Sequence, residues 1–144
     1  MAYFIDDVYT SVIQAVQQFV PSGIPVVSGE SYGIDLNDPS GKSPSIAVTL
    51  EDITDNPIEL GSNGVTIVMS CTVNAASRLQ RDALKSILYT NIANTEIPIY
   101  SSGILTQYSH VVPGMQIRDM PNYTSGNTAF YWVCVAFFTL ELLQ

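Results

Sequence analysis

Apolar and polar residues alternate most clearly between Val65 and Val73. Successive side chains of a strand point to opposite faces, so this pattern predicts a strand with one buried and one mostly exposed face. Asn63-Gly64, directly before it, is a turn signal that places the beginning of the strand at Val65. The apolar positions on the predicted buried face are Val65, Ile67, Met69, Cys71 and Val73.

A helix is predicted directly after this strand. Ser77 and Gln80 have the S-x-x-Q spacing of a capping box, so the helix is expected to begin at Ser77. Four apolar residues recur at helical spacing and are expected to form its buried stripe. These residues are Leu79, Ala83, Leu84 and Ile87. A one-sided strand that leads into a helix packed back on it is the simplest nucleus of an α+β fold.

Two longer elements are predicted near the ends of the chain. From Tyr3 to Val20 the apolar residues keep the period of an amphipathic helix, and Pro21-Ser22-Gly23 then ends that helix. From Ala129 to Leu143 both faces of a predicted strand are apolar. Such a strand is typical of the middle of a covered sheet.

Between the first helix and the clearest strand, two strands and two long loops are predicted. We expect an edge or bent strand from Ile24 to Ile34 and a second strand from Ser45 to Glu51. The two strands are interpreted as a hairpin whose long tip is the loop from Asp35 to Pro44. A second long loop is expected from Asp52 to Ser62.

After the second helix the hydrophobic pattern is weaker. Ile97 to Tyr100 predicts a short strand, Gly103 to Val112 a strand or extended arm, and Met115 to Asn127 an irregular segment. We therefore predict one domain over residues 1–144, of the α+β class. It would consist of a mostly antiparallel sheet with an N-terminal helix and a second helix packed on one face.

Composition narrows the classes of function. Charged residues make up 12% of the chain, about half of the usual share of ~25%. A chain so poor in charge is either a monomer with a neutral surface or a protein that buries surface in partners, and composition leaves both open. The net charge of −8, with five basic residues, argues against tight binding to the phosphate backbone of nucleic acids.

No targeting segment is recognised in the sequence. The N-terminus carries Asp6 and Asp7 and no basic residue, unlike a secretory signal. The longest apolar run, Ala129 to Phe138, is too short to span a bilayer. Cys71 and Cys134 occupy core positions of predicted strands, so we expect two reduced, buried thiols and synthesis in the cytoplasm.

Candidate catalytic and metal-binding residues are few. His110, the single histidine, has no partner at the spacing of a zinc site or a Ser-His-Asp site, so a structural or surface role is expected. No glycine-rich nucleotide motif occurs. Asp52, Asp55 and Glu59 could bind calcium in a loop, but they lack EF-hand spacing, and a solvated acidic loop is the preferred interpretation. We therefore expect no catalysis, no cofactor and no metal.

Three of the five basic residues are predicted to share one helical face: Arg78, Arg81 and Lys85. Two interpretations stay open. The face could be solvated and hold an internal pair such as Asp82 with Lys85, or it could contact an acidic neighbour, including another copy of the chain. The candidate interface consists of these residues with the acidic set, namely Arg78, Arg81, Lys85, Glu51, Asp52, Asp55 and Glu59.

The order of the predicted elements resembles the phage tail-terminator family and related tail-completion or neck proteins. The resemblance covers most of Tyr3 to Tyr100. It is carried by the strand Val65 to Val73 with the helix beginning at Ser77, and by the end of the N-terminal helix, Phe19-Val20-Pro21-Ser22-Gly23-Ile24-Pro25-Val26.

This resemblance implies a structural protein of the virion neck. It implies a homo-oligomeric ring, commonly a hexamer, that terminates the tail tube and joins it to the head. The partners would be the tail tube protein and a neck or connector protein, and DNA would pass through the lumen without specific binding. An acidic chain suits such a lumen. The alternatives are another head-tail connector or stopper-type protein, or a small ligand- or peptide-binding α+β domain.

Overall fold

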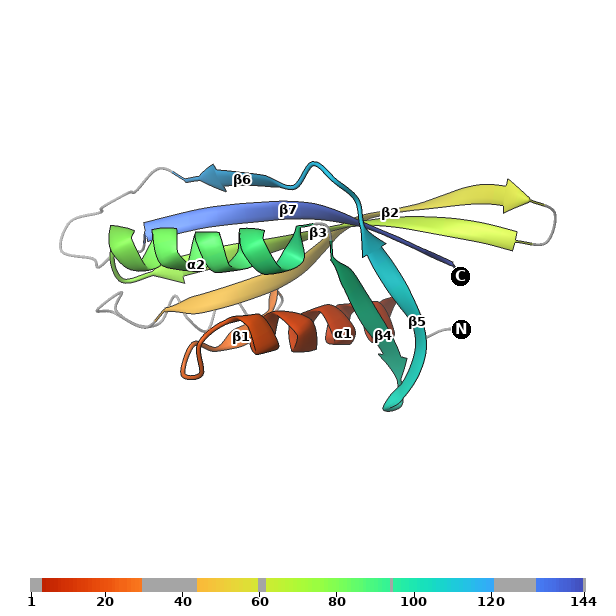
Figure 1. Ribbon diagram of the computed structural model, residues 1–144, viewed down its shortest axis with the longest axis horizontal. Helices are drawn as coiled ribbons and strands as arrows, with labels where there is room; N and C mark the ends of the chain where they lie inside the picture. The colour runs from red at the N-terminus through yellow and green to blue at the C-terminus, as the bar shows by residue number, and fades with distance from the viewer. Residues whose placement is uncertain (1–3, 30–43, 60–61, 94, 121–131, 144) are drawn as a thin grey trace.

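The computed structural model describes residues 4–29, 44–59, 62–93, 95–120 and 132–143, with only the backbone for residues 56–59, 62 and 63. These residues form two helices and a sheet of seven strands (Figure 1). In chain order the elements are α1 Phe4–Phe19, β1 Val26–Ser28, β2 Ser45–Glu59, β3 Ser62–Ala75, α2 Arg78–Ile92, β4 Glu96–Ser101, β5 Ile104–Val111, β6 Gln116–Asp119 and β7 Trp132–Leu143.

The sheet is mixed but mostly antiparallel, and the predicted α+β class is confirmed. Its strands follow the order β1-β2-β3-β7-β5-β4, and β6 also pairs with β7. β5 and β6 pair with the same edge of β7, β5 at Val111–Leu140 and β6 at Asp119–Cys134. The two strands are separated by a short turn in which Gly114 has a φ of +106°. The prediction that Met115 to Asn127 is irregular is therefore wrong for β6, while residues 121–127 lie outside the described residues.

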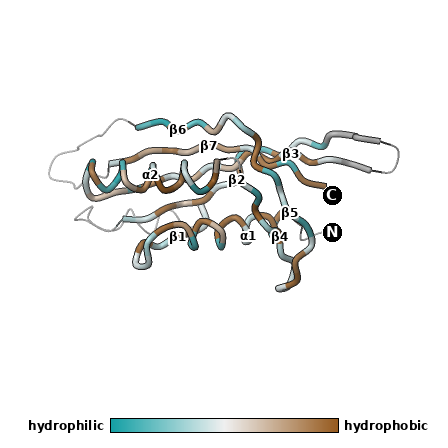
Figure 2. Tube along the Cα trace, viewed as in Figure 1, coloured by the Kyte–Doolittle hydropathy of each residue, from teal (hydrophilic) through white to brown (hydrophobic). Residues whose placement is uncertain are grey.

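The hydrophobic core fills the space between the helices and one face of the sheet, which we call the inner face. All five predicted inward residues of β3 are buried, each exposing 2% of its surface or less. Cys134, Ala136 and Phe138 of β7 pair across from β3 on the same face, and β7 lies inside the sheet as predicted. Cys71 and Cys134 are buried free thiols, as expected. Figure 2 shows the apolar residues concentrated along β3, β7 and α1.

α1 is held against the sheet by apolar packing and by one tyrosine. Val8, Val12 and Val16 belong to the core. The hydroxyl of Tyr9 donates to the Val48 carbonyl oxygen at 2.6 Å and accepts from the Gly29 amide at 3.2 Å. It therefore joins α1 to β2 and to the chain after β1. Neither described helix is long and apolar enough to cross a membrane.

Two predictions for the region around β2 are wrong. β1 and β2 do not form a hairpin, because they pair in parallel, with Val26 opposite Ile46. Parallel neighbours require a crossover connection of about a dozen residues or more, and residues 29–44 supply that length. Residues 30–43, which include most of the predicted loop from Asp35 to Pro44, lie outside the described residues.

The second expected loop, from Asp52 to Ser62, is largely strand. β2 continues to Glu59 and pairs with β3 through Glu59–Ser62, so Asn63-Gly64 lies inside β3 and is not the turn. This part of β2 is mostly polar, so its sequence shows no apolar face that would predict a strand. Pairing with the strongly patterned β3 stabilises it instead.

α2 begins as the capping box predicts. The Gln80 amide donates to Ser77 Oγ at 3.1 Å, and Gln80 Oε1 accepts from the Ala76 amide at 2.8 Å. The predicted buried stripe, however, is correct for only two of its four members: Leu84 is buried and Ile87 is partly buried against the core, whereas the other two are exposed. Its first member, Leu79, is 82% exposed, and Ala83 is exposed as well. The residues that α2 buries are Arg81, Leu84, Leu88 and Ile92.

Candidate interaction surfaces

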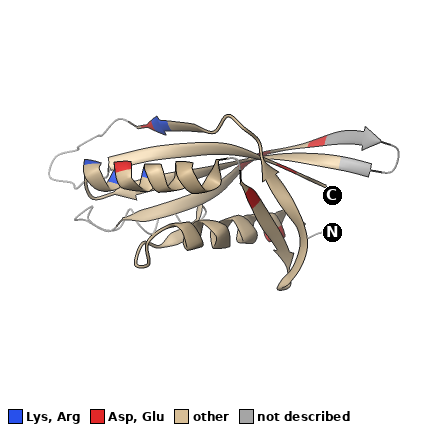
Figure 3. Ribbon diagram, viewed as in Figure 1, with Lys and Arg blue, Asp and Glu red and all other residues tan. Residues whose placement is uncertain are grey.

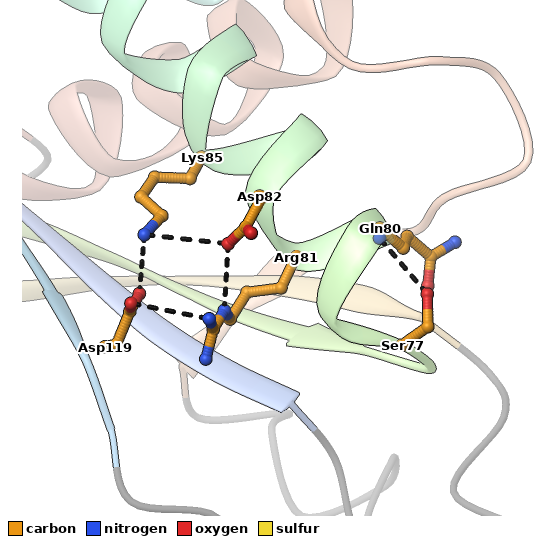
Figure 4. Close-up of polar contacts among 6 residues, drawn as sticks. All are labelled: Ser77, Gln80, Arg81, Asp82, Lys85 and Asp119. Carbon is orange, nitrogen blue, oxygen red and sulfur yellow. Dashed lines mark hydrogen bonds and ion pairs between the residues drawn. The ribbon is translucent and has the colours of Figure 1, made fainter.

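Four charged side chains connect α2 with β6, and we call them the α2–β6 ion cluster (Figure 4). Lys85 Nζ lies 2.7 Å from Asp119 Oδ1 and 3.7 Å from Asp82 Oδ1. Arg81 Nη2 lies 3.4 Å from Asp119 Oδ2, and Arg81 Nε lies 3.3 Å from Asp82 Oδ1. The internal pair between Asp82 and Lys85 that the sequence allowed is present, and Asp119 is an additional acidic partner from a distant strand.

The ion cluster favours the charged forms of Asp119 and Lys85. A hydrogen bond from Lys85 is the largest cause that lowers the pKa of Asp119, and nearby Arg81 lowers it further. The same hydrogen bond is the largest cause that raises the pKa of Lys85, although partial burial opposes the rise. Each shift stabilises the charged pair, so this contact belongs to the fold of the single chain.

Arg81 is a core residue of this region and not a surface residue. It is 8% exposed, and its guanidinium carbon lies 5.4 Å from the centre of the Trp132 ring, in the geometry of a cation–π contact. Both interpretations of the basic face, solvated or in contact with a partner, place Arg81 at the surface of the chain, and its burial contradicts them. Arg78 is exposed, and among the described residues it makes no ion pair.

The acidic half of the predicted interface lies along β2. Glu51 is the extra residue of a β-bulge between Leu50 and Asp52. Glu51 and Asp52 are exposed, and Asp55 is exposed further along the strand. Glu51 Oε1 accepts from Ser70 Oγ at 2.7 Å, and Asp52 Oδ1 accepts from the Ile53 amide at 2.9 Å. Acidic side chains and a bulge are devices that prevent an edge strand from pairing with another chain. The side chain of Glu59 lies outside the described residues.

Where their side chains are described, the predicted basic and acidic residues do not meet within one chain. Figure 3 shows the basic residues of α2 and β6 at one end of the molecule, while the acidic residues of β2, β4 and α1 lie toward the other end. The six predicted residues whose side chains are described therefore belong to two separate regions. Contact between these regions requires two copies or another partner.

A groove of about 630 Å³, which we call the β5–β7 groove, lies beside the end of β7. β5 pairs with β7 only at His110–Glu141 and Val111–Leu140 and then diverges from it. The Gln107 side chain bridges the resulting gap, because its Oε1 accepts from the Leu143 amide at 2.9 Å and its Nε2 donates to the Leu143 carbonyl oxygen. The groove is lined by Gly64, Val65, Thr66, Gln107, Tyr108, His110, Glu141, Leu142 and Leu143.

Three polar residues of the groove, Thr66, His110 and Glu141, lie on the outer face of the sheet, opposite the helices. Glu141 pairs with Thr66 on one side and with His110 on the other, and His110 pairs with Glu96 on the next strand. Residues directly opposite each other share a face, so His110 stands between two carboxylates. All three of these ionisable residues are exposed. The surface role expected for His110 agrees with its exposure.

Exposed apolar side chains lie in the groove and at the turn of the β4–β5 hairpin. The β4–β5 hairpin turns at Ser102 and Gly103, whose φ values of 52° and 81° are typical of a tight type I′ turn. After the turn Ile104 is 69% exposed. Tyr108 is 57% exposed and Leu143 56% exposed. The sequence does not predict this surface, because Gly103 to Val112 has only a weak hydrophobic pattern. The exposed apolar residues next to Ser102-Gly103 were the available signal.

The described residues contain no recognisable centre for metal chemistry. Among them, no group of three or more histidine, cysteine, aspartate or glutamate side chains is placed to hold a metal ion. A comparison with models of protein families and a search of curated protein sequences found no match to this chain.

Proposed function

We propose that this protein is a structural subunit of a phage neck. In this proposal its copies form a ring that terminates the tail tube and joins it to the head, and DNA passes through the lumen. The tail tube protein and a neck or connector protein are the other partners, and the subunit performs no catalysis. The proposal rests on the resemblance in element order, which is carried by α1, β3 and α2.

The observation that carries the assembly part of this proposal is the separation of charge along the molecule. Arg78 is exposed at the beginning of α2, while Asp52 and Asp55 are exposed on β2. Figure 3 shows basic residues of α2 at one end of the molecule and an acidic residue of β2 toward the other. A subunit with unlike, complementary ends repeats one head-to-tail contact, and the contact closes into a ring when the rotation between copies is suitable. Arg81 and Lys85 both form ion pairs with Asp119 of the same chain. Arg78 is therefore the basic residue of α2 that stays exposed without an ion pair among the described residues.

The electrostatics also support a passage for DNA. The chain carries a net charge of −8. A lumen lined by such subunits repels the phosphate backbone, and DNA therefore passes without adhering to the wall. A connector or stopper-type neck protein would have the same properties, and its position in the neck would distinguish it.

A second candidate function is favoured by the β5–β7 groove. A concave, largely apolar site with a few polar groups is typical of small-ligand or peptide binding. A protein with this function would remain a monomer, with the groove open to its ligand.

The state of assembly tests the proposal. Native mass spectrometry of the purified chain, with negative-stain imaging, should show a closed ring with one defined number of copies. Antibody labelling of purified phage particles should place the protein at the junction of head and tail. A chain that stays monomeric at high concentration and is absent from particles would refute the proposal and favour the binding domain.

A further inference from the structure

We propose that the β5–β7 groove of one copy receives the first turn of α2 from the next copy. This inference rests on the proposed function, because it identifies the contact that would repeat around the ring. The sequence predicted that α2 contacts the acidic residues of β2. In this inference the β5–β7 groove is the surface that α2 contacts.

The first turn of α2 is an apolar projection with one positive charge. Leu79 is 82% exposed, the highest value among the exposed large apolar side chains of the described residues. Arg78 beside it is exposed, and the first turn of α2 contains no acidic residue. Ala76 and Ala83 are exposed as well, and their small side chains allow another surface to approach Leu79 closely. A partner that buries this leucine and pairs with this arginine would be bound favourably.

The groove offers the complementary chemistry. Tyr108, Leu142 and Leu143 supply apolar lining, and Leu143 is already 56% exposed without a partner. Glu141 stands in the groove, and Glu96 lies two strands away on the same face. Arg78 therefore meets an acidic surface when Leu79 enters the groove. Apolar contact at the centre with a charge pair beside it is the usual anatomy of a protein interface.

The arrangement of the two surfaces requires a second copy. α2 begins at one end of the long axis, whereas the ends of β5 and β7 lie toward the other (Figure 1). The two surfaces of one chain cannot reach each other. A projection on one end that fits a groove on the other is a heterologous contact, which produces rings or filaments and not two-fold dimers.

Disulfide cross-linking tests the contact directly. The Leu79→Cys and Leu143→Cys variants change exposed side chains, so both should fold, and the native cysteines Cys71 and Cys134 are buried. After mild oxidation, a mixture of the two single variants should give a cross-linked pair, whereas neither variant alone should cross-link. A chain with both substitutions should give a covalent ladder that ends at the number of copies in the ring. Equal cross-linking in the mixture and in either variant alone would overturn the proposed contact.

Charge reversal gives an independent test. Arg78→Glu and Glu141→Arg should each weaken association roughly tenfold, and the double variant should recover most of the loss, because it restores an opposite-charge pair. Arg118→Glu is the matched control, since Arg118 is an exposed basic residue of β6 outside this contact. Association is measured by sedimentation velocity at low salt. Equal losses for Arg78→Glu and Arg118→Glu, without recovery in the double variant, would overturn the charge pairing.

Substitution of Leu79 tests the apolar part of the contact. Leu79→Ser should weaken association roughly 10- to 100-fold, which is the effect of removing one buried leucine. Ile5→Ser on α1 is the control, because Ile5 is an apolar residue that is 46% exposed and lies outside the contact. Association that is unchanged by Leu79→Ser would overturn the proposal.

These outcomes separate the contact from the proposed function. Rings that persist in the Leu79 and Arg78 variants would remove this contact and leave the phage-neck proposal in place. Specific cross-linking by a protein that is absent from phage particles would remove the phage-neck proposal and retain the contact.

Discussion

The burial of Arg81 gives the sharpest prediction, because the surface position expected from the sequence would predict the opposite effect on stability. As a surface residue, Arg81 could be changed to glutamate with little effect on folding. In the structure, its side chain is 10% exposed and contacts Trp132, Asp82 and Asp119. We therefore predict that Arg81→Glu destabilises the isolated chain itself, before any effect on assembly.

The size of the effect follows from the contacts that are lost. Arg81 makes two ion pairs with carboxylates that are 43% and 45% exposed, so solvent screening limits each pair to about 0.2–1 kcal/mol. The contact with the Trp132 ring adds about 0.5–2 kcal/mol. The new carboxylate would be buried beside two others, at a cost of about 1–3 kcal/mol. These contributions sum to about 2–7 kcal/mol, which lowers Tm by roughly 6–20 °C for a chain of this size.

Two further variants separate charge from packing. Arg81→Met keeps an apolar stem on Trp132 and adds no negative charge, so it should cost only about 1–2 kcal/mol. Arg78→Glu changes an exposed residue and should stay within about 0.5 kcal/mol of wild type. Circular dichroism during heating gives Tm, and urea titration gives the free energy of unfolding. Both are measured at a concentration where the chain is monomeric, because assembly would raise Tm. Equal Tm values, within about 2 °C, for Arg81→Glu and Arg78→Glu would refute the burial argument.

Three other predictions concern the fold. The pKa of Asp119 is lowered from 3.8 and that of Lys85 is raised from 10.5, so their pair stabilises the fold fully between these values. The stabilisation is lost as pH falls through the lowered pKa or rises through the raised one. The Tm difference between wild type and Asp119→Asn should therefore be largest near neutral pH and shrink in acid; a difference that grows in acid would contradict this. Burial raises the pKa of Cys71 to about 12 and that of Cys134 to about 11, so a maleimide should label both thiols only after unfolding in urea, and rapid native labelling would contradict it. Tyr9→Phe removes two hydrogen bonds and should lower the free energy of unfolding by about 1–3 kcal/mol, as measured by urea titration; an unchanged value would show that these bonds contribute nothing.

Local signals in the sequence were sufficient for several elements. Ser77 and Gln80 identified the beginning of α2, because a capping box requires only residues within one turn. The alternation from Val65 to Val73 identified the buried face of β3, because the period of a strand fixes which side chains share a face. The buried thiols of Cys71 and Cys134 followed from the same periodicity. These features depend on contacts that are local in the chain or on a regular repeat.

Long-range contacts decided the features that the sequence analysis predicted wrongly. Both Leu79 and Leu84 lie at helical spacing with other apolar residues, so the pattern does not fix which face of α2 is buried. The indole of Trp132 and the carboxylate of Asp119, on strands far along the chain, stabilise Arg81 in the core instead.

The β5–β7 groove likewise exists only in three dimensions. It forms because β5 diverges from β7 beyond His110 and the Gln107 side chain bridges the gap to Leu143. A pattern of hydrophobic residues records which side chains share a face of one element. It does not record which elements pack together or where paired strands separate, because those depend on the free energy of the whole packed chain.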